Sequence, residues 1–166
     1  MKKLAILLFV FSSIFMQAQV AKIIKSVNAE GDIASFELDC SKNFQVLAKG
    51  LHYNISRHEF KGVEKKNVYH LLLVMEERFI SVLNKEMTIS AVFSDGSKIS
   101  KKETVENDGF FDGACTLKMK GKKMSPGIRL VKVIVHNSTD KDQVYVISEK
   151  EASIFKSNLA NIIDAK

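Results

Sequence analysis

The sequence predicts a mostly β protein, an antiparallel β-sandwich of about seven strands that ends in one C-terminal α-helix. Apolar and polar residues alternate along several short stretches, which is typical of strands with one buried face. Turn-forming Asp-Gly and Ser-Pro-Gly sequences separate these stretches. The last segment instead places its apolar residues at helical spacing.

The N-terminus has the three-part plan of a secretory signal peptide. Met1-Lys2-Lys3 is cationic, residues 4–16 are a compact apolar run, and Ala18 offers a small residue for cleavage. A membrane anchor needs about 18 to 20 apolar residues, and this run is shorter. We therefore expect a signal peptide at 1–18 and a single domain at 19–166, periplasmic or secreted, without stable membrane insertion.

Four stretches alternate as half-buried strands do, with Val92 as the one exception. Their apolar residues recur at every second position, so each set shares one face. The four apolar faces are Ala34, Phe36, Leu38 and Cys40; Leu51, Tyr53 and Ile55; Met87, Ile89, Ala91 and Phe93; and Cys115, Leu117 and Met119. We expect these faces to form the core.

Two further runs, 68–75 (VYHLLLVM) and 128–135 (IRLVKVIV), are apolar on both faces and fit central strands. The first is ambiguous, because apolar residues between 68 and 83 also recur at helical spacing. An α+β fold with a second helix near 68–83 is therefore the alternative. A shorter strand is expected at 144–147.

One tight turn and one helix are clearly specified. Asp95-Gly96 lies between two apolar stretches and suits a hairpin turn. Ser148 is a good helix N-cap, and Glu151 completes a capping box. The sequence therefore predicts a helix over 149–164 that docks on the sheet through an apolar stripe, which consists of Ala152, Phe155, Leu159, Ile162 and Ile163.

Composition excludes several classes of protein. The chain has 166 residues, of which 46% are hydrophobic, and this fraction excludes intrinsic disorder. Two cysteines are too few for a disulfide scaffold or a cysteine-rich zinc module. Cys40 and Cys115 each lie on an apolar strand face, so we expect them to share the interior. An oxidising compartment permits a disulfide between them if their Cα atoms come within about 7 Å.

No catalytic or metal motif is present. The sequence lacks Gly-x-Ser-x-Gly, His-Glu-x-x-His, a P-loop and a dinucleotide fingerprint. His52 and His58 lie six residues apart, about 20 Å along a strand, which is too far for one metal ion to bridge. We therefore predict no catalytic residues, no metal and no cofactor, and favour a protein that is not an enzyme.

The strongest charge feature is the segment 118–123 (KMKGKK), with Lys101-Lys102 and Lys65-Lys66 elsewhere. No aromatic residue is interleaved with these lysines, and single-stranded nucleic acid binding favours such residues, so we expect no nucleic acid partner. The segment suits a solvated edge that prevents sheet-to-sheet aggregation. Contact with anionic glycans or lipid headgroups remains the functional alternative.

Phe110 and Phe111 lie between Asp108-Gly109 and Asp112-Gly113. Two adjacent side chains cannot both point into a core from an extended chain, so one of them is a candidate for contact with a partner. Phe110, Phe111, Asp108 and Asp112 are thus the candidate binding residues. The alternative is a loop that folds both rings over the edge of the sandwich.

Several segments resemble small exported proteins of Bacteroidetes-type bacteria. These segments are Gln17-Ala18-Gln19, 93–99 (FSDGSKI), 128–135 and 151–163. The resemblance implies export and a β-sandwich-like domain with a C-terminal helix, and because those proteins are largely uncharacterised it implies no catalytic residues. We expect an exported, non-catalytic module that binds a protein or glycan of the cell envelope. A secreted hydrolase whose carboxylates are assembled by the fold, or a carrier of a small apolar ligand, are the alternatives.

Overall fold

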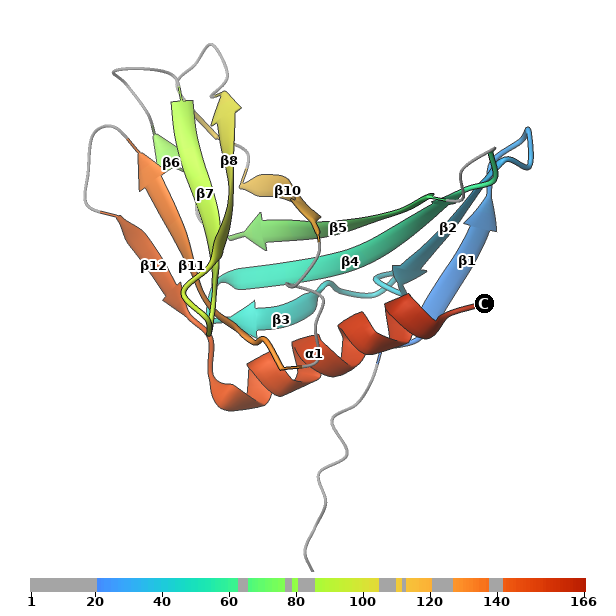
Figure 1. Cartoon of the computed structure of the whole chain (residues 1–166). Helices are drawn as coiled ribbons and strands as arrows, with labels where there is room; N and C mark the ends of the chain where they lie inside the picture. Colours follow the sequence, from blue (N-terminus) through green and yellow to red (C-terminus); the bar gives the residue numbers. More distant parts are fainter. Residues whose placement is uncertain are drawn as a thin grey trace, which may run out of the picture.

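The computed structural model describes residues 21–62, 66–76, 79–80, 86–104, 110–111, 113–120, 127–137 and 142–166, with the backbone alone at 79–80 and 110–111. Within these residues the chain forms two antiparallel sheets, a short two-stranded ribbon and one C-terminal helix (Figure 1). This is the mostly β, sandwich-like fold with one helix that the sequence predicts.

The larger sheet has six strands in the order β1-β2-β4-β5-β10, with β3 paired beside β4. All of its pairings are antiparallel, and β4 and β5 are its longest strands, with 10 residues each. The strands are β1 (Ile23–Val27), β2 (Ile33–Leu38), β3 (Gln45–Ala48), β4 (Leu51–Phe60), β5 (Lys66–Met75) and β10 (Ala114–Met119).

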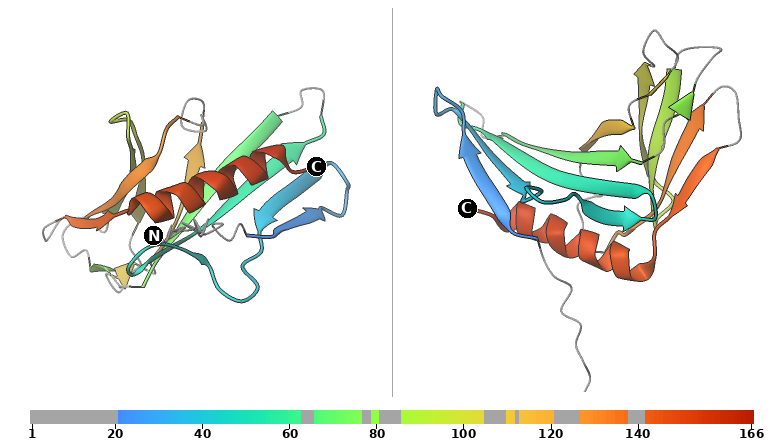
Figure 2. Two further views of the ribbon diagram at one scale, coloured as in Figure 1. Left: turned by 90° about the horizontal axis from the view of Figure 1, so that it is seen from below. Right: turned by 180° about the vertical axis from the view of Figure 1, so that it is seen from behind.

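The smaller sheet has four strands in the order β12-β11-β7-β8. It stands at one end of the larger sheet, and its strands run across those of the larger sheet (Figures 1 and 2). The strands are β7 (Glu86–Phe93), β8 (Lys98–Thr104), β11 (Leu130–Asn137) and β12 (Gln143–Val146), and the ribbon pairs β6 (Phe79–Ile80) with β9 (Phe110–Phe111). Edge strand β8 lies beside edge strand β10, so the two sheets meet there.

The hairpin turn between β7 and β8 is the one that the sequence predicts. Gly96 has a φ of 78°, which an L side chain rarely adopts, and its N–H donates to the Phe93 carbonyl. The Asp95 carboxylate accepts hydrogen bonds from the N–H and hydroxyl of Ser97. Local chemistry therefore explains this turn fully.

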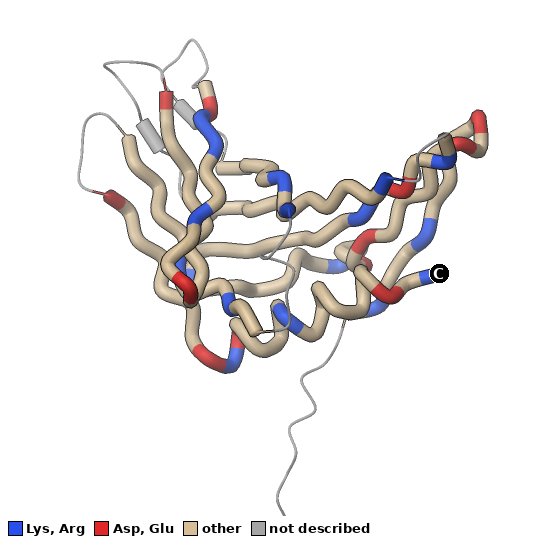
Figure 3. The backbone as a smooth tube through the Cα atoms, in the orientation of Figure 1, with Lys and Arg blue, Asp and Glu red and all other residues tan. Residues whose placement is uncertain are grey.

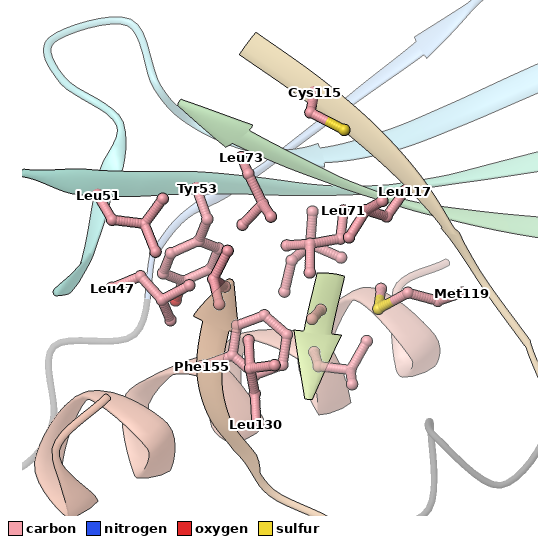
Figure 4. Packing of buried hydrophobic residues seen from close by; sticks show 14 of the residues in the cluster. Leu47, Leu51, Tyr53, Leu71, Leu73, Cys115, Leu117, Met119, Leu130 and Phe155 are labelled. Atoms are coloured by element: carbon pink, nitrogen blue, oxygen red, sulfur yellow. The ribbon is translucent and has the colours of Figure 1, made fainter. Parts of the chain in front are cut away.

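The apolar faces of the alternating strands form one continuous core, as predicted. Tyr53, Leu71 and Leu73 of the larger sheet meet Leu130 of β11 and Phe155 of the helix (Figure 4). The alternate positions of β4 and β5 are half-buried, and those of β10 are exposed. The larger sheet therefore has one face packed on the core and a second, largely polar face, here called the outer face.

Helix α1 (Glu149–Asp164) has the predicted bounds and runs along the larger sheet (Figure 2). The Ser148 hydroxyl accepts a hydrogen bond from the Glu151 N–H, which is the predicted N-cap. The residues of the apolar stripe lie in the core or against it: Ala152, Phe155, Leu159, Ile162 and Ile163. No helix in the described part of the chain has the length and apolar composition that a bilayer crossing needs.

Two expectations about elements need correction. The alternative helix near 68–83 is wrong, because 66–75 is strand β5 and 79–80 is strand β6. Tertiary packing decides this segment: Leu71, Leu73 and Met75 face the core at a period of two. The expected seven or so strands become twelve within the described residues, because short strands such as β3, β6 and β9 lack a long alternating pattern.

Candidate functional site

The predicted Phe110–Phe111 loop is only partly described. The backbone at these residues is strand β9, in which Phe111 pairs with Phe79 and Phe110 with Ile80. Asp108 and Asp112 lie outside the described residues. Contact of this segment with a partner therefore stays a prediction.

A cleft opens at the junction of the two sheets, where β8 passes β10. Its volume is about 610 Å³. Thr116 and Lys118 alternate outward on β10 while Cys115, Leu117 and Met119 face the core, so the strand period itself directs polar groups to the cleft. Strands β5, β8 and β10, together with the residue after β10, line this cleft. The lining residues are His70 of β5; Lys98, Ile99, Ser100 and Lys101 of β8; Thr116, Leu117 and Lys118 of β10; and Lys120, which follows β10. We call this the lysine cleft.

Positive charge dominates the lysine cleft. Four of its lining residues are lysines and none is acidic. Figure 3 shows Lys positions in blue along β8 and at the end of β10. Glu103 of β8 forms an ion pair with one of them, its carboxylate lying 2.6 Å from the Lys101 ammonium. Within the described residues, no ion pair joins Lys118 or Lys120 to an acidic side chain.

Two histidines lie together on the outer face beside this cleft. His58 and His70 are on neighbouring strands, and their ring centroids are 5.2 Å apart. Ser35 Oγ is 2.8 Å from His58 Nδ1, and Ser56 Oγ is 3.3 Å from His58 Nε2. Partial burial lowers the pKa of His70, and the neighbouring His58 and Lys118 lower it further. His70 is therefore mostly neutral at pH 7.

The Ser35–His58 contact has the length of a nucleophile–base pair but lacks what acyl transfer also requires. Both residues lie within paired strands, where backbone N–H groups take part in the sheet ladder. Those N–H groups are therefore engaged and cannot form an oxyanion hole beside Ser35. The second ring nitrogen of His58 faces the Ser56 hydroxyl. A catalytic triad has a carboxylate at this position, which orients the imidazole and stabilises its positive charge. This arrangement is structural.

A second cleft, of about 480 Å³, lies beside edge strand β3. Phe44 and Val46 form an exposed apolar wall, while His52 Nε2 is 3.6 Å from Glu76 Oε1 on the polar side. Unlike the lysine cleft, it combines one lysine with one carboxylate among its lining residues. It shows no bias toward ligands of one charge.

Cys115 is buried in the core, whereas Cys40 is partly buried against the core and also lines the second cleft, and both are free thiols. Cys40 follows the end of β2 by two residues, and strands β4 and β5 lie between β2 and β10, the strand that holds Cys115. Burial, and then a hydrogen bond to Glu103, raise the pKa of Cys115 to about 12, while burial raises the pKa of Cys40.

The structure brings together only part of what the sequence singled out. Lys101, Lys118 and Lys120 come from two of the basic segments and share one cleft, whereas Lys66 lies at the start of β5 and does not line it. The His58–His70 pair was missed, because the register of β4 against β5 creates it. The sequence indicated only that each histidine alternates with core-facing residues of its own strand, and therefore points to the outer face.

Within the described residues, no group of three or more His, Cys, Asp or Glu side chains can hold a metal ion. No protein-family model, curated protein or solved structure matches this chain.

Proposed function

We propose that the mature chain is an exported, non-catalytic module that binds an acidic glycan of the cell envelope in the lysine cleft. The single observation that supports this is the convergence of Lys98, Lys101, Lys118 and Lys120 around one cleft with no acidic lining residue. The sequence of residues 1–18 supports export.

The composition of the cleft favours a polyanion over other ligands. Lysine is a strongly hydrated point charge without the fork geometry of arginine, so it suits a ligand that carries several negative groups. Hydroxyls from Ser100 and Thr116 add hydrogen-bonding groups for a polyhydroxylated chain. An apolar ligand would leave these polar groups unsatisfied, which weighs against the carrier alternative.

The test is calorimetric titration of the mature protein with three probes: oligogalacturonate, a sulfated heparin tetrasaccharide and neutral maltotetraose. We expect the two acidic probes to bind and maltotetraose to bind much more weakly. Affinity should decrease with added salt, because exposed charges are screened over about 8 Å at physiological ionic strength. A single-stranded oligonucleotide serves as a fourth probe. If it binds more tightly than both acidic glycans, the ligand of the cleft is a nucleic acid and the glycan proposal is wrong.

The variant Lys118→Ala/Lys120→Ala should weaken acidic-probe binding by roughly tenfold or more, because it removes two of the four ammonium groups. The matched control is Lys150→Ala/Lys156→Ala, which removes the same charge from exposed positions of α1. Equal losses in both variants would show that net charge, not the cleft, attracts the ligand, and the proposal would then be withdrawn.

A further inference from the structure

His70 differs from the other cationic groups of the lysine cleft. It is half-buried on the central strand β5, whereas the four lysines are exposed. The register places Lys118 of β10 on one side of it and Ser56 of β4 on the other. His70 therefore lies deeper in the structure than any ammonium group of the cleft.

Positive or neutral groups surround His70 on every element packed against it. The His58 ring of β4 is tilted against it with 5.2 Å between ring centroids, Lys118 of β10 lies opposite, and β8 contributes Lys98 and Lys101 across the cleft. Its outward neighbours on β5, two positions away in each direction, are Val68 and Leu72. The register places the Glu37 carboxylate of β2 beyond Ser56, about two strand spacings or 10 Å from His70, and Glu103 of β8 is already paired with Lys101. In the ligand-free protein these surroundings oppose a charge on the imidazole.

We infer that His70 anchors the negative group of the ligand, and that the ligand binds together with a proton that converts this side chain to imidazolium. The inference rests on the proposed function, because it assigns a role within the same cleft. An anion placed between His70 and Lys118 offsets the repulsion that keeps the imidazole neutral. It also accepts a charge-assisted hydrogen bond from the imidazolium.

The chemistry of the ligand follows from this coupling. The acidic group must keep its charge while His70 gains its own, so its pKa must lie well below that of imidazole. Sulfate esters and uronate carboxylates of glycans meet this condition. A phosphate monoester does so less well, because its second proton is gained near pH 6, in the same range as the imidazole.

Proton uptake predicts the direction of the pH dependence. Binding raises the pKa of His70, so affinity increases as pH falls through the interval between the pKa of the bound state and the lower pKa of the free state. Uptake of one proton gives a slope of at most about tenfold per pH unit within that interval. A cleft that binds through lysines alone would show constant affinity from pH 5.5 to 8, because lysine does not titrate there.

The experiment titrates the mature protein with the sulfated heparin tetrasaccharide at several pH values from 5.5 to 8, by calorimetry and by NMR of the histidine ring protons. Oligogalacturonate is the second arm and distinguishes carboxylate from sulfate. We expect the affinity to increase at low pH and the His70 titration to move upward when ligand is bound. His136, which is exposed and paired with Asp142 on the smaller sheet, is the internal control and should not respond.

The variant His70→Asn should bind with a flat pH profile, whereas His136→Asn should keep the wild-type profile. Amide NMR spectra establish that both variants are folded, and the ring-proton titration of the wild type tests the inference without any variant. Binding with a flat wild-type profile overturns this inference and leaves the proposed function in place. Absence of binding at every pH overturns the proposed function and this inference with it.

Discussion

Arg57 shows how one buried charge can organise two elements. Its guanidinium is almost fully buried and stacks on the Phe36 ring at 4.2 Å. It donates hydrogen bonds to the carbonyls of Ile163 and Ala165 at the end of α1, and forms an ion pair of 2.8 Å with Glu59. These carbonyls have no partner within the helix, so Arg57 of β4 acts as its C-terminal cap.

The variant Arg57→Ala should lower the free energy of unfolding by about 3 kcal/mol, because it leaves two partly buried carbonyls and the face of the Phe36 ring without partners. Urea denaturation measures this change. The matched control is Arg129→Ala, since Arg129 is half-exposed and lies 3.7 Å from the exposed Glu149. That variant should lose less than about 1 kcal/mol. Similar losses would show that the Arg57 contacts are not stabilising.

The thiols provide a second prediction at this scale. With a pKa of about 12, Cys115 carries roughly one thiolate in ten thousand at pH 8. A thiol reagent such as Ellman's reagent should therefore label Cys115 only after unfolding, whereas the half-buried Cys40 should react slowly in the native protein. Two free thiols should be counted in guanidinium chloride without reductant. A count of zero there would mean that the cysteines had been oxidised.

At the scale of elements, α1 is expected to be integral to stability. Phe155 is 3% exposed, and its ring centroid lies 5.2 Å from that of Tyr53. Replacement by alanine leaves a cavity between helix and sheet, so Phe155→Ala should cost about 3–5 kcal/mol. Lys156→Ala, at the next and exposed position, should stay within about 0.5 kcal/mol. Thermal or urea unfolding curves that coincide for the two variants would contradict docking of the helix.

The elements that could be predicted are those in which a regular pattern of apolar and polar residues continues over many positions. Strand β10 alternates without exception between buried and exposed positions, and α1 carries both its cap and its apolar stripe in the local sequence. Strand β1 could not be found in this way, because four of its five residues are exposed and packing does not select their type. Strand β5 was ambiguous because it is apolar on both faces, and only its neighbours β4 and β10 decide between strand and helix.

At the scale of the whole molecule, the lysine cleft depends on topology. Lys101 and Lys118 belong to different sheets and meet only because the edge strands β8 and β10 lie together. The alternation of residues within one strand does not show which strands of different sheets lie side by side. The sequence alone therefore could not place the lysines of β8 in the cleft. The inward position of Cys115 on β10 could be predicted from its alternating neighbours, but the end of β2 before Cys40 and the strands between β2 and β10 could not.

The contacts of α1 also determine the order in which the chain can fold. Near the end of the chain, Asn158 accepts a hydrogen bond from the Ala21 N–H and donates one to the Tyr53 hydroxyl, while Arg57 holds the final helical turn. The core faces of the N-terminal strands therefore stay uncovered until α1 is present. During synthesis, with its N-terminus first, the chain would expose the apolar side of β4 to water until Asp164 had left the ribosome.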